Sequence, residues 1–243
     1  MALLDRPKAV LLDFDGTLID NSVVAASVEQ ACDSIATAVR TLDREQLLSA
    51  NMAAWNEYWP EVERRCWLGE MDVLDVSREV WRRALEACGC DDAAIVDFAH
   101  ATLRQIGSEM ARLFDDVPDL LGALSNTGTL GALITNSSMR SQRARLQDVG
   151  LDAVFAAVVI SGEIGVAKPD PAIFATALER IGLTAAEVWH VGDSLSTDVA
   201  GAQAAGICSV WLNRTGQALT EADPIPDLQV NSLDEVAEML RRH

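Results

Sequence analysis

Asp13-Phe14-Asp15-Gly16-Thr17-Leu18 directly follows the apolar run Val10-Leu11-Leu12, and this order of residues decides the fold. The short aliphatic run predicts a buried strand of a parallel sheet. Its two carboxylates then stand at the carboxyl end of the strand, where open α/β sheets bind their ligands. Gly16 permits a sharp turn that leaves backbone N–H groups free to face an anion. Because two neighbouring carboxylates repel each other, the motif favours a bound divalent cation; an ordinary solvated Asp-Gly turn is the alternative.

Three further segments repeat this arrangement, with polar residues at the point where an apolar run stops. The run 130–134 leads into Thr135-Asn136-Ser137, and the run 158–160 leads through residues 161–163 to Lys168. The run 187–191 leads into Gly192-Asp193-Ser194, and Asp198 lies five residues after Asp193. We expect all four segments to converge on one site.

In this order, the four segments resemble the motifs of the haloacid dehalogenase-like hydrolase superfamily: an Asp-x-Asp, a Ser/Thr, a Lys and a Gly-Asp with a later Asp. They extend from Asp13 to Asp198. Each motif alone is weakly specific, whereas the ordered set is strongly specific. The resemblance implies an α/β fold, a doubly wound parallel sheet with a Rossmann-like core and an inserted α-helical cap.

Hydrophobic periodicity divides the chain in the same way. The segment between the first motif and about residue 112 shows helical spacing and no convincing strand. Helices are expected at residues 24–39, 43–59, 72–87 and 92–113, the second of them stopped by Pro60. From residue 117 onward, strands alternate with helices, which predicts a parallel sheet.

We therefore expect an α/β hydrolase core at residues 1–19 and 115–243 and a helical cap at residues 20–114. Hinges are expected near residues 18–22 and 114–120, where Pro118 makes a natural break in the chain. A single compact domain, with the helices packed on one face, is the alternative.

The resemblance assigns chemistry to the acidic residues. Asp13 is implied to be the nucleophile that attacks phosphorus and forms an aspartyl-phosphate. Asp15 is implied to protonate the leaving oxygen and later to activate water. The cofactor Mg²⁺ is implied to bind Asp13, Asp193 and the backbone carbonyl of Asp15.

The same resemblance assigns the phosphate-binding groups. Thr135 and the N–H of Asn136 would hold phosphate oxygens, and Lys168 would neutralise charge on the nucleophile and the phosphoryl group. Asp198 would orient Lys168 or a metal-bound water. As alternatives, residues 135–137 form only a helix N-cap, Lys168 is a surface lysine, and Asp198 is a solvated helical acid. His190 is expected to be a packed core histidine.

Asp15 also separates reactions within the superfamily. Members that cleave carbon–halogen bonds lack an acid there, because a halide leaves without a proton. Phosphonate-cleaving members need a lysine in the cap, whereas Lys8 and Lys168 are the only lysines of this chain. The sequence therefore predicts a Mg²⁺-dependent phosphatase acting on a small phosphorylated metabolite. A sugar phosphomutase and a non-catalytic binding or regulatory protein are the alternatives.

Substrate choice would depend on the cap, which holds four of the six tryptophans. Arg64 and Arg65 precede a glycine-containing connection between two helices, residues 66–70, to which Trp67 belongs, and these three residues are candidates for contacting the substrate. The alternative is that Trp59 and Trp81 form the core of the cap and that the arginines only balance neighbouring glutamates.

Composition limits the partners. A formal net charge of −18 argues against nucleic acid. No apolar stretch is long enough to span a membrane, and residues 1–8 lack a secretory signal core, so we expect a soluble cytoplasmic protein. The five cysteines are scattered, and Cys88 and Cys90 complete no zinc site, which favours reduced thiols whose role stays open. The oligomeric state stays open too.

Overall fold

A six-stranded parallel sheet forms the centre of the protein, whose computed structural model describes residues 6–242. The strand order is β3-β2-β1-β4-β5-β6. The strands are β1 (Ala9–Leu12), β2 (Leu130–Thr135), β3 (Ala157–Ile160), β4 (Val188–Gly192), β5 (Cys208–Leu212) and β6 (Leu228–Val230). Leu12 of β1 pairs with Leu133 of β2 on one side and with Val191 of β4 on the other. The strand order therefore reverses at β1, where such sheets open a ligand-binding crevice.

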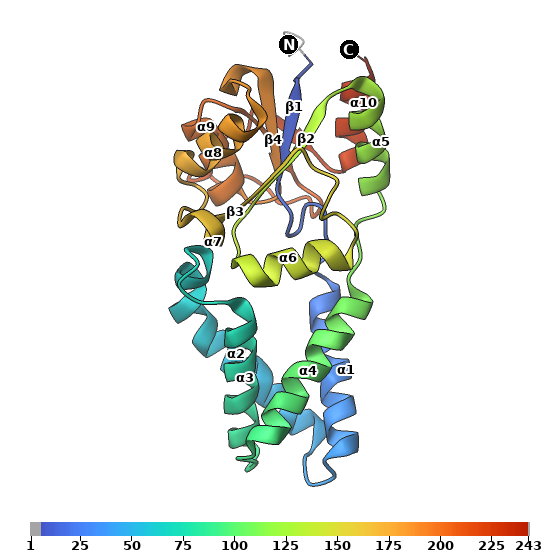
Figure 1. Cartoon of the computed structure of the whole chain (residues 1–243), viewed down its shortest axis with the longest axis vertical. Helices are drawn as coiled ribbons and strands as arrows, with labels where there is room; N and C mark the ends of the chain where they lie inside the picture. The colour runs from blue at the N-terminus through green and yellow to red at the C-terminus, as the bar shows by residue number, and fades with distance from the viewer. Residues whose placement is uncertain (1–5, 243) are drawn as a thin grey trace.

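Helices cover both faces of this sheet, which confirms the doubly wound α/β fold (Figure 1). One face packs against α5 (Val117–Thr127) and α10 (Leu233–Arg242). The other face packs against α8 (Pro171–Ile181) and α9 (Ala200–Ala204). The strands are buried almost throughout because apolar side chains point to both layers. Two further helices, α6 (Met139–Asp148) and α7 (Ser161–Ile164), follow the carboxyl ends of β2 and β3.

Four helices lie between β1 and α5 in the chain and extend away from the sheet (Figure 1). They are α1 (Val23–Ala38), α2 (Arg44–Trp67), α3 (Val73–Ala87) and α4 (Ala93–Met110). Aspartates before α2, α3 and α4 accept hydrogen bonds from the first helical turn, as N-caps do. The four helices enclose apolar clusters of their own, one of them around the fully buried Trp81. We propose the same division as the sequence suggests, with residues 20–114 as a cap and 1–19 and 115–243 as the core; residues 1–5 and 243 lie outside the described range.

The prediction that Pro60 stops the second helix is wrong. Helix α2 runs through Pro60 and continues to Trp67. A proline inside a helix removes one backbone hydrogen bond and costs about 3 kcal/mol. Beyond Pro60, Val62 and Cys66 are buried in an apolar cluster shared with α3. Burial of these side chains offsets the cost of the proline and keeps the helix intact.

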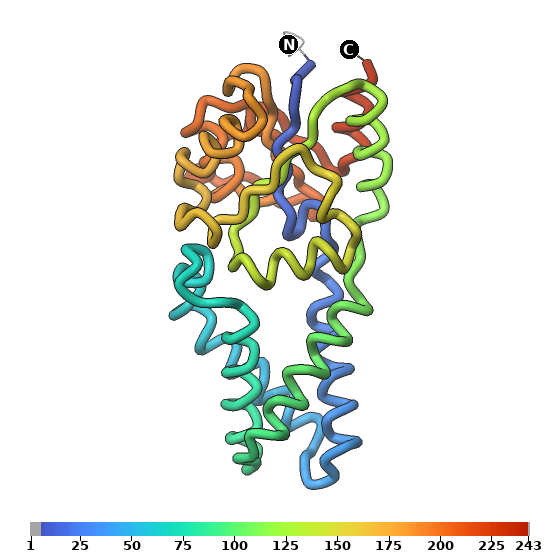
Figure 2. Tube along the Cα trace, viewed as in Figure 1, coloured from blue at the N-terminus to red at the C-terminus, as the bar shows by residue number. Residues whose placement is uncertain are grey.

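The two chain segments that join cap and core run side by side (Figure 2). The N–H of Asp20 donates to the carbonyl of Arg112 at 3.0 Å, and the N–H of Phe114 donates to the carbonyl of Leu18 at 3.0 Å. An ion pair of 2.6 Å joins the side chains of Arg112 and Asp20. Pro118 does not break the chain as expected; it lies in the first turn of α5, where its missing N–H is tolerated. The paired residues 18–20 lie within the range expected for the first hinge, and residues 112–114 reach only the start of the range expected for the second.

Among the described residues, no helix combines the length and the apolar character needed to cross a membrane.

Candidate active site

Asp13 lies directly after β1, at the carboxyl edge of the sheet. Its N–H donates to the carbonyl of Val191 on β4 at 3.0 Å, which fixes its position between two strands. The carboxylate is only 5% exposed, and its Oδ1 lies 2.6 Å from Nζ of Lys168. Lys168 itself is 3% exposed, so the alternative of an ordinary surface lysine is wrong.

Asp198 holds Lys168 from the opposite side. Its Oδ1 accepts hydrogen bonds from Lys168 Nζ at 2.6 Å and faces His190 Nε2 at 3.0 Å, while its Oδ2 accepts one from the N–H of Ser194 at 3.0 Å. Asp198 is 1% exposed, so it is not a solvated helical acid. His190 is buried, as predicted, with its ring edge-on to Phe174 at 5.0 Å. Both oxygens of Asp198 are therefore occupied by protein partners.

The site contains more negative charge than positive charge. Burial raises the pKa of Asp13 well above its usual value, although Lys168 opposes the shift. Burial and the charge of Asp198 raise the pKa of Asp193 to about 6. Burial alone would also raise the pKa of Asp198, but Lys168 and His190 outweigh it and lower that pKa. Three carboxylates thus share one buried ammonium group, an arrangement that a divalent cation would relieve.

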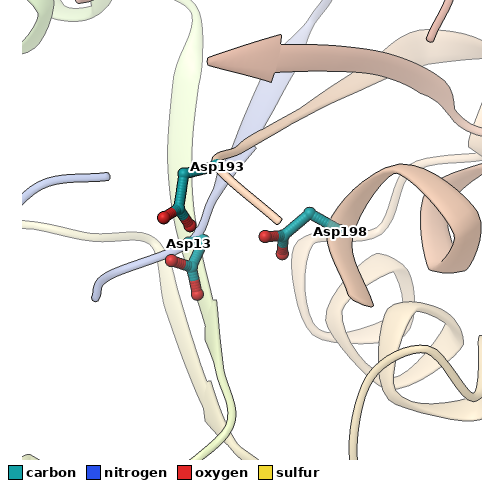
Figure 3. A group of neighbouring side chains, drawn as sticks. All are labelled: Asp13, Asp193 and Asp198. Carbon is teal, nitrogen blue, oxygen red and sulfur yellow. The ribbon is translucent and has the colours of Figure 1, made fainter. Parts of the chain in front are cut away.

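The donor set fits Mg²⁺. One oxygen from each of Asp13, Asp193 and Asp198 lies within 4.8 Å of the others, and Figure 3 shows these carboxylates facing a common space. A Cβ on Gly16 would overlap with the carboxylate of Asp193, so only glycine lets this acid come so close. Carboxylate oxygens are the ligands that Mg²⁺ prefers. Because the oxygens of Asp198 already have partners, Asp13 and Asp193 remain as the carboxylates able to hold a metal.

Asp15 is held by α6, a contact that the sequence did not predict. Its Oδ1 lies 2.6 Å from Nη2 of Arg145, and its Oδ2 accepts a hydrogen bond from Gln142 Nε2 at 3.2 Å. The same Gln142 nitrogen donates to Oγ1 of the fully buried Thr135 at 2.9 Å. Gln142 therefore brings Asp15 and Thr135 together. In the sequence, Gln142 and Arg145 resemble the ordinary polar face of a helix, so no pattern distinguished them.

Asn136 fixes the loop that carries Lys168. Its Oδ1 accepts from the backbone N–H of Lys168 at 2.8 Å, and its Nδ2 donates to the carbonyl of Lys168 at 2.9 Å. The N–H of Ser137 donates to Oγ of Ser161 at 3.0 Å. Residues 135–137 do not cap α6 with a side chain; Ser138 stands at that position, and its hydroxyl accepts from the N–H of Val73 in the cap at 3.1 Å.

A cavity of about 740 Å³ lies between the helical segment and the core, and Asp15 and Asn136 are part of its wall. Trp55 and Trp59 also line it, with their rings stacked at 5.0 Å between centroids, and so does Trp67. This volume suits a small-molecule ligand.

The structure places two of the three candidate cap residues away from this cavity. Arg64 and Arg65 are exposed and absent from its wall, and the nearest acid to Arg65 is Glu70 at 3.7 Å. The arginines that line the cavity are Arg104 on α4 and Arg145 on α6. Trp67 is therefore the one candidate of the three that the structure brings to the site.

The connection after α2 closes against the core beside this cavity. A Cβ on Gly69 would overlap with the carbonyl oxygen of Gly162 in α7, so the two backbones are in direct contact. Arg140 on α6 reaches Asp75 at 2.8 Å and Asp72 at 3.5 Å on the other side of the boundary.

Comparisons with known proteins agree with this geometry. A family model described as haloacid dehalogenase-like hydrolase matches residues 7–206. A phosphoserine phosphatase of Thermus thermophilus is 32% identical, over 94% of this chain and 97% of its own. An N-acylneuraminate-9-phosphatase of Mus musculus is 25% identical, over 98% of this chain and 95% of its own. The crystal structure of a 2-haloacid dehalogenase from Pseudomonas syringae pv. Tomato DC3000 superposes with a TM-score of 0.69 and 28% identity, over 97% of this chain and 99% of that one.

Proposed function

The chain belongs to the haloacid dehalogenase-like hydrolases, and we propose that it is a phosphatase that hydrolyses the monoester of a small phosphorylated metabolite. One observation carries the proposal: Asp15 lies two residues beyond Asp13 and is held at the cavity wall by Arg145 and Gln142. An alkoxide is a poor leaving group without a proton, so a second carboxyl beside the nucleophile suits ester cleavage. Relatives named as phosphatases support the same reaction class.

In the first step, a carboxylate oxygen of Asp13 attacks phosphorus and forms an acyl-phosphate bond. The bond between phosphorus and the ester oxygen breaks, and Asp15, protonated once its ion pair with Arg145 has opened, gives this proton to the departing alcohol. Lys168, 2.6 Å from Asp13 Oδ1, stabilises the negative charge of the nucleophile and of the transferred group. Asp198 and Asn136 hold Lys168 by its ammonium group and its backbone, so the lysine needs no rearrangement to act.

In the second step, water hydrolyses the aspartyl-phosphate. Asp15 takes a proton from the water, whose oxygen attacks phosphorus and releases inorganic phosphate and the free Asp13 carboxylate. Asp13, Asp193 and the backbone carbonyl of Asp15 would hold Mg²⁺, which when bound supplies positive charge to the phosphoryl oxygens. Thr135 and the N–H of Asn136 are our candidates for holding the remaining phosphate oxygens.

The test is release of inorganic phosphate from p-nitrophenyl phosphate and from glycerol 3-phosphate, with MgCl₂ or with EDTA. We expect the kcat of Asp13→Asn to be about one thousandth of the wild-type value or lower. Asp15→Asn should lower kcat/KM for glycerol 3-phosphate by about 100-fold or more. The loss on p-nitrophenyl phosphate should be smaller, because nitrophenolate leaves without help from an acid. Asp152→Asn, an exposed acid outside the site, is the matched control. Full activity of Asp13→Asn, or activity unaffected by EDTA, would contradict the proposal.

Dehalogenation is the second candidate, because similar solved structures, among them two at 28% and 25% identity, are described as dehalogenases. Chloride release from 2-chloropropionate without phosphate release would favour it. A phosphomutase would instead isomerise a sugar phosphate and release little phosphate, so it is recognised by conversion of a sugar phosphate into its isomer without release of inorganic phosphate.

A further inference from the structure

Arg104 on α4 is a cation of the cavity wall that has no acidic partner. It lines the wall, it is exposed, and it forms no ion pair with any residue between 6 and 242. The other arginine of the wall, Arg145, pairs with Asp15 at 2.6 Å, and Asp20 of the wall pairs with Arg112 at 2.6 Å.

The residues around Arg104 leave its charge in place. A smaller cavity of about 210 Å³ adjoins it, lined also by Asp75 and His100. Asp75 is engaged by Arg140 at 2.8 Å. Burial and the charge of Arg104 lower the pKa of His100, so this histidine is neutral and does not change the charge around Arg104. Asp148, the remaining acid of the large cavity, is exposed and forms no ion pair within residues 6–242.

We propose that Arg104 is a specificity residue that binds a second anionic group, on the alcohol part of the phosphomonoester. The inference rests on the proposed phosphatase function and names its substrate class. A guanidinium recognises a carboxylate or a phosphate through two parallel hydrogen bonds. Asp15 and Arg104 line the same cavity, and Asp13 stands two residues before Asp15, so the proposal places the phosphate at the Asp15 end of the cavity and the second anionic group at α4.

The other walls of the cavity suit such a ligand. The indoles of Trp55, Trp59 and Trp67 give one side of it an apolar wall. Because Arg104 belongs to the helical segment whereas Asp13 directly follows β1, only a ligand that spans both would engage both groups.

The experiment compares esters that differ in one group. The first pair, 6-phosphogluconate and sorbitol 6-phosphate, differs only by a carboxylate in place of a CH₂OH group. The second pair, 3-phosphoglycerate and glycerol 3-phosphate, makes the same exchange on a shorter chain. The third pair, fructose 1,6-bisphosphate and fructose 6-phosphate, tests a second phosphate instead of a carboxylate. Release of inorganic phosphate gives kcat and KM for each ester.

The variants are Arg104→Met, Arg104→Lys and the control Arg64→Met. Arg64 is also an exposed cap arginine without an ion pair in residues 6–242, but it does not line the cavity. We expect Arg104→Met to lower kcat/KM for the preferred ester with a second anionic group by about tenfold or more, mainly through KM. The kcat/KM of its partner without that second group should change by less than about twofold. Arg104→Lys should restore part of the loss, and Arg64→Met should match wild type.

The outcomes distinguish a failure of the role proposed for Arg104 from a failure of the proposed phosphatase function. Equal losses on both members of every pair, no wild-type preference for an anionic member, or the same effect from Arg64→Met would overturn the role of Arg104 and leave the phosphatase standing. Absence of phosphate release from every ester, p-nitrophenyl phosphate included, would overturn the proposed function and this inference with it.

Discussion

Asp193 should destabilise the protein when no metal is bound and stabilise it when Mg²⁺ is present. Burial and the nearby charge of Asp198 raise the pKa of Asp193 from 3.8 to about 6. At pH 8 the group is therefore ionised in a place that disfavours its charge. Replacement of Asp193 by asparagine removes the charge, keeps the shape, and also removes a carboxylate able to hold Mg²⁺.

The magnitude follows from the shift. Each pKa unit corresponds to about 1.4 kcal/mol, which would give a destabilisation of about 3 kcal/mol for a wholly desolvated group. Asp193 is exposed as a residue, so solvent screening reduces this value to about 1 kcal/mol. For a chain of this size, that free energy raises the melting temperature by about 3 °C. Mg²⁺ at about 100 times its Kd would stabilise the wild type by about 2.7 kcal/mol, and the variant by much less.

Thermal unfolding at pH 8 in EDTA and in MgCl₂ measures both effects. Asp193→Asn should melt about 3 °C above wild type in EDTA and below it in MgCl₂. Asp152→Asn removes an exposed charge elsewhere and should follow wild type in both buffers. A variant that melts at or below wild type in EDTA would refute the repulsion, and an equal response to Mg²⁺ would refute Asp193 as a metal ligand.

Two further substitutions test closure and stability. Gly69→Ala should lower kcat/KM for p-nitrophenyl phosphate by about tenfold, because its Cβ would overlap with the carbonyl of Gly162 and hold cap and core apart. Gly89 has nearly the same φ as Gly69, +77° against +76°, but a Cβ there meets nothing within 4 Å, so Gly89→Ala is the control. An equal loss of kcat/KM in Gly89→Ala would show that backbone strain alone causes the effect. Asp116→Asn should lower the free energy of unfolding at pH 7 by about 2 kcal/mol, because the partly buried pair with Arg214 is broken. Although burial opposes it, the Arg214 guanidinium lowers the pKa of Asp116, so this contribution is present above the usual value of 3.8 and is lost below it. In urea titrations, the difference between wild type and variant should therefore shrink from pH 5 to pH 3, and a constant difference would contradict the pairing.

The strands that carry the site could be predicted because each is an apolar run that ends in polar residues. Helix α8 also carries local sequence signals at both ends, since Asp170 and Pro171 begin it and Gly182 ends it. Strand β6 was not predicted: its three residues become a strand only by pairing with β5, where Val210 faces Leu228. Tertiary pairing of this kind leaves no local signal.

The arginines that line the cavity could not be predicted for a similar reason. Arg64 and Arg65 stand close to the inter-helix connection in the sequence, yet α2 directs them to the surface. Arg104 and Arg145 lie on α4 and α6, two helices far apart in the sequence that come into contact only in the folded chain. A polar residue on an amphipathic helix faces either solvent or a cavity, and periodicity does not distinguish the two.

His190 shows how a correct prediction can still miss the function of a residue. It was expected to be packed, and it is, but its Nε2 also meets Asp198 Oδ1 at 3.0 Å. Burial lowers the pKa of His190. The ring is therefore neutral, and its one proton must sit on Nε2 to donate to that carboxylate. Asp198 reaches the ring because a π-helical turn, Leu195–Val199, follows Ser194 and points its carboxylate back toward β4. A neutral histidine that donates to Asp198 keeps this acid oriented toward Lys168 without competing for its charge, so His190 positions the lysine that faces the nucleophile.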